Sequence, residues 1–309
     1  MELRQLEVFL AVVEAGTISA AARRLGAAQS AVSTVVRALE EDLGVALFVR
    51  TSRRAVVTDA GRALLPEARR VLAGLCEARS AVLDADGGPS GPLAVGVVTT
   101  MHPVDLPLLL QRFTTANPRV SVSMRVFADG SRGLLRALVD GELDVAFLSW
   151  PFRPPASVVL RHLDRTAFRL LLPPGHPLAS SAPVELADLA GDRWIDGPPG
   201  FANRLQVDAL FARVGATRRV VLEVPDVSTF PRYVAAGLGP AFVPGSVPVG
   251  TGCHEQPVAG EPLSWTLSLA TARPSPERPV RKAVTAFAEA VDRHVRRSAP
   301  APGVSTRGR

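Results

Sequence analysis

Side chains that can donate or accept hydrogen bonds recur on one face of the stretch Gln29 to Leu43. Four aliphatic residues of this stretch are spaced so that, at about 100° per residue, they fall on one narrow stripe of a helix. They are Val32, Val36, Leu39 and Leu43. The opposite face then carries Ser30, Ser33, Thr34, Arg37 and Glu41. Hydroxyl and guanidinium groups on an exposed helix face are groups that pair with base edges in the major groove of DNA.

The elements around this stretch fit a helix-turn-helix. A short Ala/Arg-rich helix is predicted from Ser19 to Leu25, and Gly26 separates it from the second helix. An earlier helix is predicted to end at Gly16, with Thr17 as the cap of the next one. Its apolar face is predicted to contain Leu3, Leu6, Phe9, Leu10 and Val13. The alternative is an ordinary set of surface helices, since any surface helix is polar on its outer face.

A basic cluster follows in RTSRRAVVT, residues 50 to 58. Arg50, Arg53 and Arg54 lie close together there without an acidic residue. The segment predicts a two-stranded wing with the arginines near its tip. Such a wing can lie on the phosphate backbone or reach into the minor groove. The alternative is an exposed basic hairpin with no partner.

A long helix is predicted from Asp59 to about Leu83, with Thr58 as its cap. Six of its residues repeat at alternating steps of four and three, and a seam this narrow indicates a helix that pairs with a second copy. They are Leu64, Ala68, Val71, Leu75, Ala78 and Val82. The Gly- and Pro-rich segment DADGGPSGP, Asp84 to Pro92, is typical of an interdomain linker.

Beyond this linker, short apolar strands alternate with helical patterns. Strands are predicted at 93–98, 120–126, 143–148, 168–172, 194–195, 220–224, 241–243 and 265–270. Helices are predicted around 106–113, 134–139, 203–214, 228–236 and 278–297. This alternation is typical of βαβ units around a parallel sheet. The last strand and helix are expected to return to the first of two subdomains, and the tail SAPAPGVSTRGR is expected to be disordered.

Length and composition limit the class of protein. A chain of 309 residues exceeds the usual size of one core, so at least two domains are expected. The formal net charge is +6 and the pI about 10.6, but Lys282 is the only lysine, and an Arg-rich composition also follows from a GC-rich genome. No long apolar run and no secretory signal is present, so a cytoplasmic protein without a membrane partner is expected. Cys76 and Cys253 form no metal or redox motif.

Enzyme motifs are missing from the sequence. The histidines, which follow no metal-binding spacing, are His102, His162, His176, His254 and His294. No nucleotide-binding loop and no nucleophile elbow occurs. Cys253 and His254 are neighbours, but adjacent side chains of a strand point apart, which disfavours a Cys/His dyad. We therefore expect no catalytic residue, no metal and no cofactor.

Several longer stretches resemble one family, the LysR-type transcriptional regulators. At the N-terminus they are MELRQLEVFLAVVEAGTISAAARRL, AQSAVSTVVRALEEDLGVALFVRT and the Thr58-Asp59-Ala60-Gly61 that opens the long helix. Further along, GELDVAF, PPGHPLA and VAAGLGPAFVP resemble landmarks of that family's effector domain. The resemblance runs from Met1 to about Arg297.

The resemblance implies an N-terminal all-α winged helix-turn-helix with a long linker helix. It also implies a C-terminal α/β effector domain of two Rossmann-like subdomains, similar to periplasmic binding proteins. The corresponding ranges are 1–58 for DNA binding, 59–90 for the linker helix and hinge, 91–297 for the effector domain and 298–309 for the tail. Within the effector domain, one subdomain would span about 91–163 with 268–297, and the other about 164–267.

The partners implied are double-stranded DNA with an inverted-repeat operator, a small-molecule effector, further copies of the chain in a dimer or tetramer, and RNA polymerase. Carried over position by position, the residues facing the groove would be Gln29, Ser30, Ser33, Thr34 and Arg37, and those of the wing Arg50, Arg53 and Arg54. The family often has Pro in place of Ser30 and Arg in place of Thr34. Loss of a base-reading arginine could change the preferred site, at ~1–3 kcal/mol per bidentate contact.

An effector is expected beyond the carboxyl ends of the strands, where ligands of open α/β sheets bind. The candidate residues are Thr99, Thr100, Met101, Ser131, Ser149, Trp150, Phe201, Ser228 and Thr229. Hydroxyls beside helix N-termini suit an anion, and Trp150 with Phe201 suits an apolar body. Each hydroxyl could instead cap its helix, and Trp150 could be core or cleft wall. Asp226 could repel an anion or cap a helix.

Another interpretation of the C-terminal half is a solute-binding protein. The absence of a secretion signal and the DNA-binding pattern that precedes this half favour the regulator.

Overall fold

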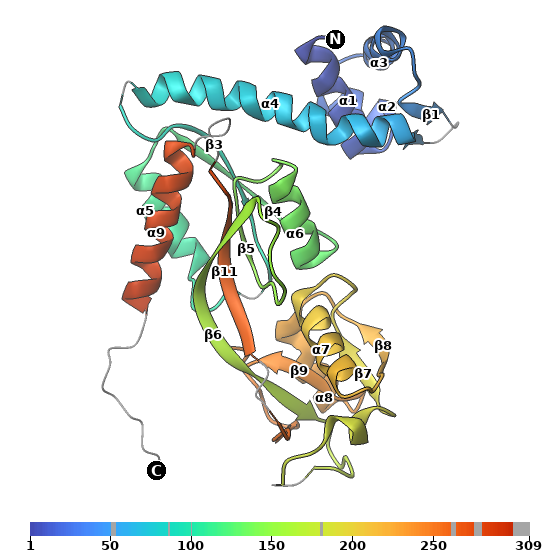
Figure 1. Ribbon diagram of the computed structural model, residues 1–309, viewed down its shortest axis with the longest axis vertical. Helices are drawn as coiled ribbons and strands as arrows, with labels where there is room; N and C mark the ends of the chain where they lie inside the picture. The colour runs from blue at the N-terminus through green and yellow to red at the C-terminus, as the bar shows by residue number, and fades with distance from the viewer. Residues whose placement is uncertain are drawn as a thin grey trace. The chain divides into compact units, whose positions relative to one another are not determined.

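The computed structural model describes residues 1–50, 54–85, 87–99, 101–179, 182–260, 264–274 and 280–298 (Figure 1). The chain divides into two compact units. Unit 1 contains Met1–Gly91 and Asp140–Glu142, and unit 2 contains Pro92–Val139 and Leu143–Arg309.

Unit 1 begins with short helices whose ends follow from local chemistry. Its described elements are α1 (Leu3–Ala15), α2 (Ile18–Arg24), α3 (Gln29–Leu43), β1 (Phe48–Arg50), β2 (Ala55–Val57) and α4 (Asp59–Ala85). Gly16 ends α1 with a left-handed φ of +69°, which glycine adopts without steric cost. Thr17 caps α2, because its Oγ1 accepts a hydrogen bond from the Ala20 N–H at 3.1 Å. The predicted helix end and cap are both confirmed.

The aliphatic stripe of α3 packs into the core of unit 1. Val32, Val36 and Leu39 are buried, as predicted. The prediction is wrong for Leu43, which is 37% exposed. Leu43 is the last residue of α3, and the chain turns away at Gly44 with a φ of +70°.

The buried face of α1 is wider than the predicted one. Its buried residues are Leu6, Val8, Phe9, Ala11 and Val12, whereas Leu10 and Val13 are half-buried and Leu3 is exposed. The helix contacts α2, α3 and α4 at once, so a single narrow stripe cannot describe its packing.

Glu40 fixes the loop that connects α3 to β1. Its Oε1 accepts the backbone N–H of Leu47 at 2.8 Å and that of Phe48 at 3.1 Å. From the other side, Thr58 Oγ1 donates to the carbonyl of Ala46 at 2.8 Å. The loop is thereby held between the end of α3 and the start of α4.

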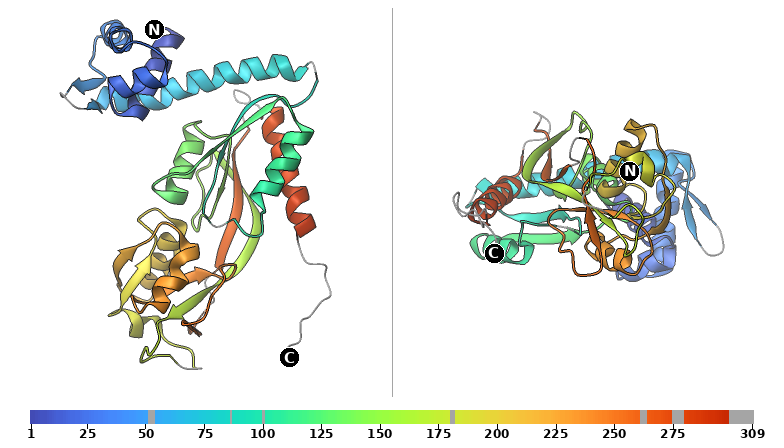
Figure 2. Two further views of the ribbon diagram at one scale, coloured as in Figure 1. Left: turned by 180° about the vertical axis from the view of Figure 1, so that it is seen from behind. Right: turned by 90° about the horizontal axis from the view of Figure 1, so that it is seen from below.

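Unit 2 is an α/β structure with a mixed sheet (Figures 1 and 2). Its first elements are β3 (Gly91–Gly96), α5 (Leu106–Ala116), β4 (Val120–Arg125), α6 (Gly130–Val139), β5 (Val145–Leu148) and β6 (Val158–Leu172). Then come η1 (Leu186–Leu189), β7 (Arg193–Asp196), α7 (Ala202–Arg213), β8 (Arg219–Glu223), η2 (Val227–Thr229), α8 (Phe230–Ala235) and β9 (Ala241–Pro244). The last are β10 (His254–Gln256), β11 (Ser264–Ala272) and α9 (Lys282–Ser298).

The main sheet corrects the expectation of a parallel sheet. Its strand order is β10-β6-β11-β5-β3-β4, and β9 also pairs with β6. β3 and β5 are parallel, and so are β7 and β8 in a separate pair, but β6 and β11 run antiparallel. The sequence predicted only the end of β6, because its middle, Arg161 to Arg165, is polar and shows no apolar alternation.

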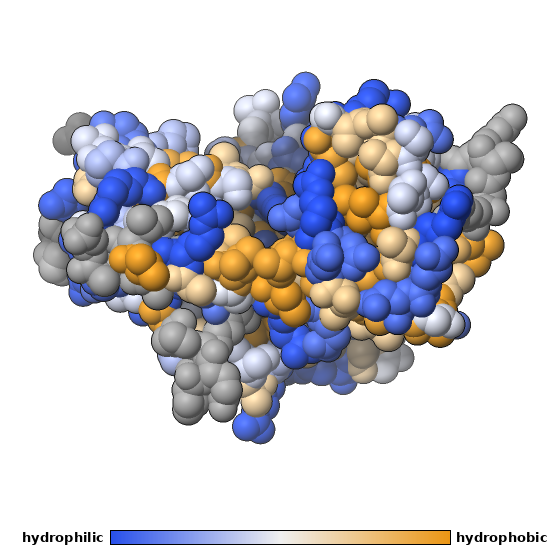
Figure 3. Space-filling view, turned by 90° about the horizontal axis from the view of Figure 1, so that it is seen from above, coloured by the Kyte–Doolittle hydropathy of each residue, from blue (hydrophilic) through white to orange (hydrophobic). Residues whose placement is uncertain are grey.

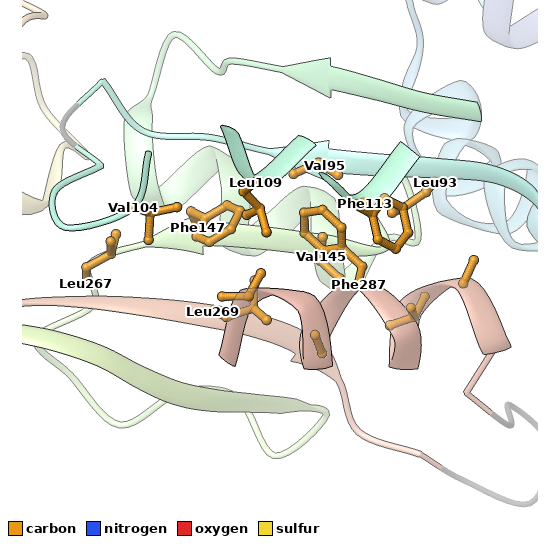
Figure 4. Packing of buried hydrophobic residues seen from close by; sticks show 14 of the residues in the cluster. Leu93, Val95, Val104, Leu109, Phe113, Val145, Phe147, Leu267, Leu269 and Phe287 are labelled. Carbon is orange, nitrogen blue, oxygen red and sulfur yellow. The ribbon is translucent and has the colours of Figure 1, made fainter. Parts of the chain in front are cut away.

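The helices cover both faces of this sheet. Figures 1 and 2 show α5 and α9 side by side on one face, with α6 on the other. A core lies between the sheet and the α5/α9 layer (Figure 4). In it, the ring of Phe287 meets those of Phe113 and Phe147 edge to face, with ring centres 5.0 Å and 6.2 Å apart. A second core surrounds Trp194, whose ring stacks on that of Phe242 with the ring centres 5.7 Å apart. The tail from residue 299 lies outside the described residues.

In the described part of the chain, no single helix is long and apolar enough to cross a membrane. By length and composition α1 and α2 pass that test only as a pair, bent by 116°.

We expect Glu40→Ala to lower the free energy of unfolding by about 1–3 kcal/mol, because two backbone N–H groups lose their shared acceptor. Chemical denaturation followed by circular dichroism measures the change. Glu41→Ala is the matched control, since Glu41 is the exposed neighbour on the same helix. Equal losses in the two variants would contradict the role of Glu40.

Candidate DNA-binding surface and ligand cavity

The polar face of α3 is exposed over its length. Gln29, Ser30, Thr34 and Arg37 are exposed, and Ser33 is half-buried at the edge of the face. These residues stand opposite the buried stripe of the same helix. The structure thus brings the predicted groove-facing residues together on one surface.

The wing is present as a two-stranded hairpin. β1 pairs antiparallel with β2, with Phe48 opposite Val57 and Arg50 opposite Ala55. The Ala55 N–H donates to the carbonyl of Gly16 at 2.9 Å, which ties the hairpin to the turn between α1 and α2. Arg54 is exposed beside β2. Arg53 and the side chain of Arg50 lie outside the described residues.

The seam predicted along α4 divides into two parts. Leu64 and Ala68 pack against the core of unit 1. Val71, Leu75 and Val82 are 45%, 39% and 72% exposed, and Ala78 is exposed as well. Figure 3 shows hydrophobic side chains gathered in patches between hydrophilic ones on the face that it draws. The second half of the seam is therefore an apolar surface that unit 1 leaves uncovered.

Unit 2 contains a ligand-sized cavity of about 340 Å³. It lies beyond the carboxyl ends of β3, β4 and β5, where the N-termini of α6 and α7 meet, and β11 closes one side. Most of its wall is apolar. The apolar lining includes Val97, Val98, Val126, Phe127, Phe201, Val224, Val227, Phe230 and Trp265.

Four of the predicted effector residues line this cavity. They are Thr99, Ser131, Ser149 and Phe201. Met101 does not line it and packs against the neighbouring core instead. Thr100 lies outside the described residues. Trp150 lines a second cavity, together with Ser149.

Ser228 and Thr229 do not line the cavity. The Ser228 hydroxyl donates to Asp226 Oδ1 at 2.7 Å, and the Thr229 hydroxyl donates to the Asp226 carbonyl at 2.7 Å. Asp226 also accepts the Ser228 N–H at 3.0 Å, so it caps η2. Of the alternatives that the sequence left open, capping describes Asp226, whereas the hydroxyls of Ser228 and Thr229 donate to Asp226 and cap no helix. The predicted helix 228–236 is correspondingly divided into η2 and α8.

Two buried polar side chains in the cavity wall have unsatisfied atoms. Ser131, in the first turn of α6, is 1% exposed and its Oγ has no hydrogen-bond partner. Asn203, in the first turn of α7, is 7% exposed, and its Oδ1 has none either. Its Nδ2 donates to Asp196 Oδ1 at 2.9 Å and to the carbonyl of Phe242 at 3.2 Å. Helix N-termini favour negative charge. In the first turn of α6, the N–H groups of Gly130, Arg132 and Gly133 already donate to backbone carbonyls.

Asp196 orients Asn203 from within a buried ion pair. Its Oδ2 lies 2.5 Å from Nη2 of Arg218, and both side chains are 2% exposed. Burial raises the pKa of Asp196, against the opposing effects of the Arg218 charge and of hydrogen bonds from Asn203 and Gly197. The guanidinium also packs over Trp194, 5.5 Å from the ring centre. No local sequence pattern predicts this pair, whose members are 22 residues apart.

Two glycines let the halves of unit 2 approach each other at the cavity. Gly130 has a φ of +55°, and a Cβ there would lie 2.8 Å from the Phe201 ring. Gly200 has a φ of +95°, and a Cβ there would lie 2.7 Å from the carbonyl of Asp129. The N–H of Arg132 donates to the Gly200 carbonyl at 3.2 Å. The turn sequence Pro198-Pro199-Gly200 was a signal that sequence reasoning could have used.

Two family patterns match the chain. One, described as "Bacterial regulatory helix-turn-helix protein, lysR family", matches residues 3–62. The other, described as "LysR substrate binding domain", matches residues 86–296. No group of metal-binding side chains occurs among the described residues.

The chain is also similar to individual regulators of known sequence or structure. The chain is 35% identical over 244 residues to the HTH-type transcriptional regulator ShiR of Corynebacterium glutamicum (strain R), covering 78% of this chain and 82% of that protein. It is 33% identical over 252 residues to the HTH-type transcriptional regulator ClcR of Pseudomonas putida, covering 80% and 84%. The crystal structure of full-length CbnR complexed with its target DNA has a TM-score of 0.61 at 29% identity, covering 97% of this chain and 100% of that one.

We expect Asp196→Asn to lower the free energy of unfolding by about 3–5 kcal/mol, because it leaves the buried Arg218 charge without its buried partner. Asp208→Asn is the matched control, since Asp208 Oδ1 lies 2.8 Å from the same Nη2 but is 49% exposed. That control should lose at most about 1 kcal/mol. Urea denaturation of both variants measures the difference, and similar losses would show that burial of the pair is not what stabilises it.

Proposed function

The chain belongs to the LysR family of transcriptional regulators, and from that premise we propose that it binds an inverted-repeat operator in double-stranded DNA as an oligomer and responds to a small anionic effector. The observation that carries the DNA-binding part is the exposed polar face of α3 beside the β1–β2 hairpin. Helix and hairpin together offer hydroxyl, amide and guanidinium groups to base edges and phosphates. The DNA complex of the similar CbnR supports this assignment.

Oligomerisation is supported by the second half of the α4 seam. Val71, Leu75 and Val82 expose aliphatic surface that a second copy of the helix would remove from water. A dimer would present two copies of α3, and their separation would set the spacing of the half-sites. An imperfect inverted repeat is the operator that such a dimer fits, and pairing of dimers gives the proposed tetramer.

The effector site is proposed to be the cavity beside Ser131 and Asn203. The positive ends of the α6 and α7 dipoles favour an anion, and the Ser131 hydroxyl has no protein partner to give up. Phe201 and Trp265 supply the apolar wall for the rest of the ligand. Among the described lining residues there is neither a basic nor an acidic side chain, so helix N-termini would carry the recognition of charge.

An effector could act by changing how the two halves of unit 2 meet. Contacts across the cavity include the Arg132–Gly200 hydrogen bond and one from Gln206 Nε2 to Ser149 Oγ at 3.1 Å. A ligand that binds one arrangement more tightly than another shifts their populations by that difference in affinity. Through the oligomer, such a shift would alter the spacing or bending of the bound DNA.

For the DNA-binding surface, we expect Arg37→Ala to weaken binding to the operator by about 1–3 kcal/mol and to leave binding to random DNA nearly unchanged. The exposed Arg37 lies on the groove-facing side of α3. Fluorescence anisotropy on the intergenic DNA beside the gene, against shuffled DNA at the same salt concentration, measures both affinities. Equal losses on the two DNAs would make Arg37 a phosphate contact.

For the effector cavity, we expect Val227→Phe to fill the site and abolish ligand-induced stabilisation without changing operator affinity. Small carboxylic acids are screened by thermal shift, and any acid that raises the Tm of the native chain is retested on the variant. Val214→Phe is the control, because Val214 is 49% exposed and lies outside the cavity. An acid that stabilises both variants equally would place its site elsewhere.

A further inference from the structure

Four aromatic side chains from separate segments line the proposed effector cavity. Phe127 follows β4, Phe201 precedes α7, Phe230 begins α8 and Trp265 lies in β11. Phe230 and Trp265 are fully buried. The valines that complete the wall are Val97, Val98, Val126, Val224 and Val227. Such a wall favours a ligand whose body is itself apolar, because binding removes both surfaces from water.

The volume of the cavity sets the size of that body. The cavity measures about 340 Å³, and an apolar cavity of about 150 Å³ holds one benzene molecule. A body of two fused rings therefore fits this space, whereas a single ring leaves much of the apolar wall without a contact. Flat rings also pack edge to face or offset against Phe and Trp side chains.

The polar part of the lining is small and uncharged. It consists of the side chains of Thr99, Ser131, Ser149 and Asn203. Ser149 Oγ already accepts a hydrogen bond from Gln206 at 3.1 Å, and the Asn203 Nδ2 donates to protein acceptors. One carboxylate alone has acceptor sites for about four donors. The polar lining can therefore serve one small charged group at most.

The positive charges near the cavity are already neutralised within the protein. Arg218 is paired with Asp196, and both side chains are 2% exposed. Arg204 Nη1 lies 3.5 Å from the carbonyl of Gly197 in the cavity wall, but its guanidinium pairs with two carboxylates. Among the described lining residues none carries a charge. A second carboxylate on a ligand would therefore be buried without a counter-charge, which is strongly unfavourable.

We propose that the effector cavity selects an apolar, two-ring monocarboxylate and rejects ligands that carry a second charge. The inference rests on the proposed function, because the single negative charge faces the N-termini of α6 and α7 assigned there. It adds the class of the ligand. The rings contact Phe201, Phe230 and Trp265, and the uncharged wall excludes a second carboxylate.

Four naphthalene compounds separate the contributions of size and charge. 2-Naphthoate carries one charge, naphthalene-2,6-dicarboxylate carries two, and 2-naphthamide carries none. 6-Isopropyl-2-naphthoate is the matched control for the dicarboxylate, because an isopropyl group and a carboxylate have the same number of heavy atoms. A difference between these two ligands therefore reports the second charge and not the added bulk.

Binding is read at Trp265, which lines the cavity, in the full chain labelled with 5-fluorotryptophan. Trp194 is the internal reference, because it is fully buried in another core. The ¹⁹F resonances are assigned with single Trp→Phe variants. Val227→Phe, which fills the cavity, should remove every ligand-induced shift at Trp265, and the Trp194 resonance should stay in place throughout.

We expect 2-naphthoate and 6-isopropyl-2-naphthoate to shift the Trp265 resonance saturably. The dicarboxylate should have a dissociation constant at least about a hundredfold higher than that of 6-isopropyl-2-naphthoate, because its second charge is buried unpaired. 2-Naphthamide should bind more weakly than 2-naphthoate, since it lacks the charge that the helix N-termini favour.

A variant that supplies the missing counter-charge tests the cause of this selectivity. Val126 lines the cavity and is 69% exposed, so a lysine there keeps its stem and ammonium group in a solvated position. Val126→Lys should narrow the ratio between the two dissociation constants at least about tenfold. Val126→Gln is the matched control, because it adds a long polar side chain without a charge, and it should leave the ratio unchanged.

The outcomes distinguish this inference from the proposed function. A dicarboxylate that binds within about threefold of 6-isopropyl-2-naphthoate overturns the inference, and so does an unchanged ratio in Val126→Lys. Either result leaves an anion bound in the cavity, so the proposed function stands. No saturable shift with either monocarboxylate also overturns the inference, whereas the screen of small carboxylic acids tests the anionic effector separately. Equal binding of 2-naphthamide and 2-naphthoate overturns both.

Discussion

The antiparallel pairing of β6 with β11 is the constraint on which unit 2 depends. The paired residues run from Ser264 opposite Ala167 to Ala272 opposite Val158. Both strands contribute to the core around Phe287 and to the core beneath α6. Because side chains alternate along β11, Trp265 faces one cavity and its neighbours face the other. The ladder therefore holds the two cores together and keeps the two ligand-sized spaces apart.

The contacts that close the effector cavity are weaker than this ladder. They include the Arg132–Gly200 and Gln206–Ser149 hydrogen bonds and the close approach of Phe201 to Gly130. Each hydrogen bond contributes only about 0.5–1.5 kcal/mol net. Rearrangement at the cavity is thus far less costly than separation of β6 from β11, which makes the cavity the place where a small ligand could shift the structure.

Sequence patterns predicted what local spacing determines. The bounds of α3, the cap at Thr17, the β1–β2 hairpin and most helices of unit 2 follow from periodicity and capping residues. The polar middle of β6 was not predicted as a strand, because it shows no apolar alternation. It is held in the sheet by pairing with β11, which lies about a hundred residues later in the chain. The cavity was located by its strand ends, but Asn203, Gly130 and the Asp196–Arg218 pair depend on distant contacts that no local pattern encodes. Ser228 and Thr229 were predicted to face the ligand, but their hydroxyls donate to Asp226 in the same turn.

The chemistry of α3 gives a reason for the uncovered seam on α4. The exposed face of α3 offers hydroxyls and one amide with a single guanidinium, Arg37, and individual base contacts contribute about 1–3 kcal/mol at best. A regulator typically binds its operator more favourably than random DNA by about 4–10 kcal/mol. So few contacts on one half-site do not supply that difference. Two copies of α3 on one operator double the contacts and add the symmetry of the site. Exposed aliphatic residues such as Val71 and Leu75 are costly on a monomer, and the proposed pairing of two copies on one operator would give a reason for them.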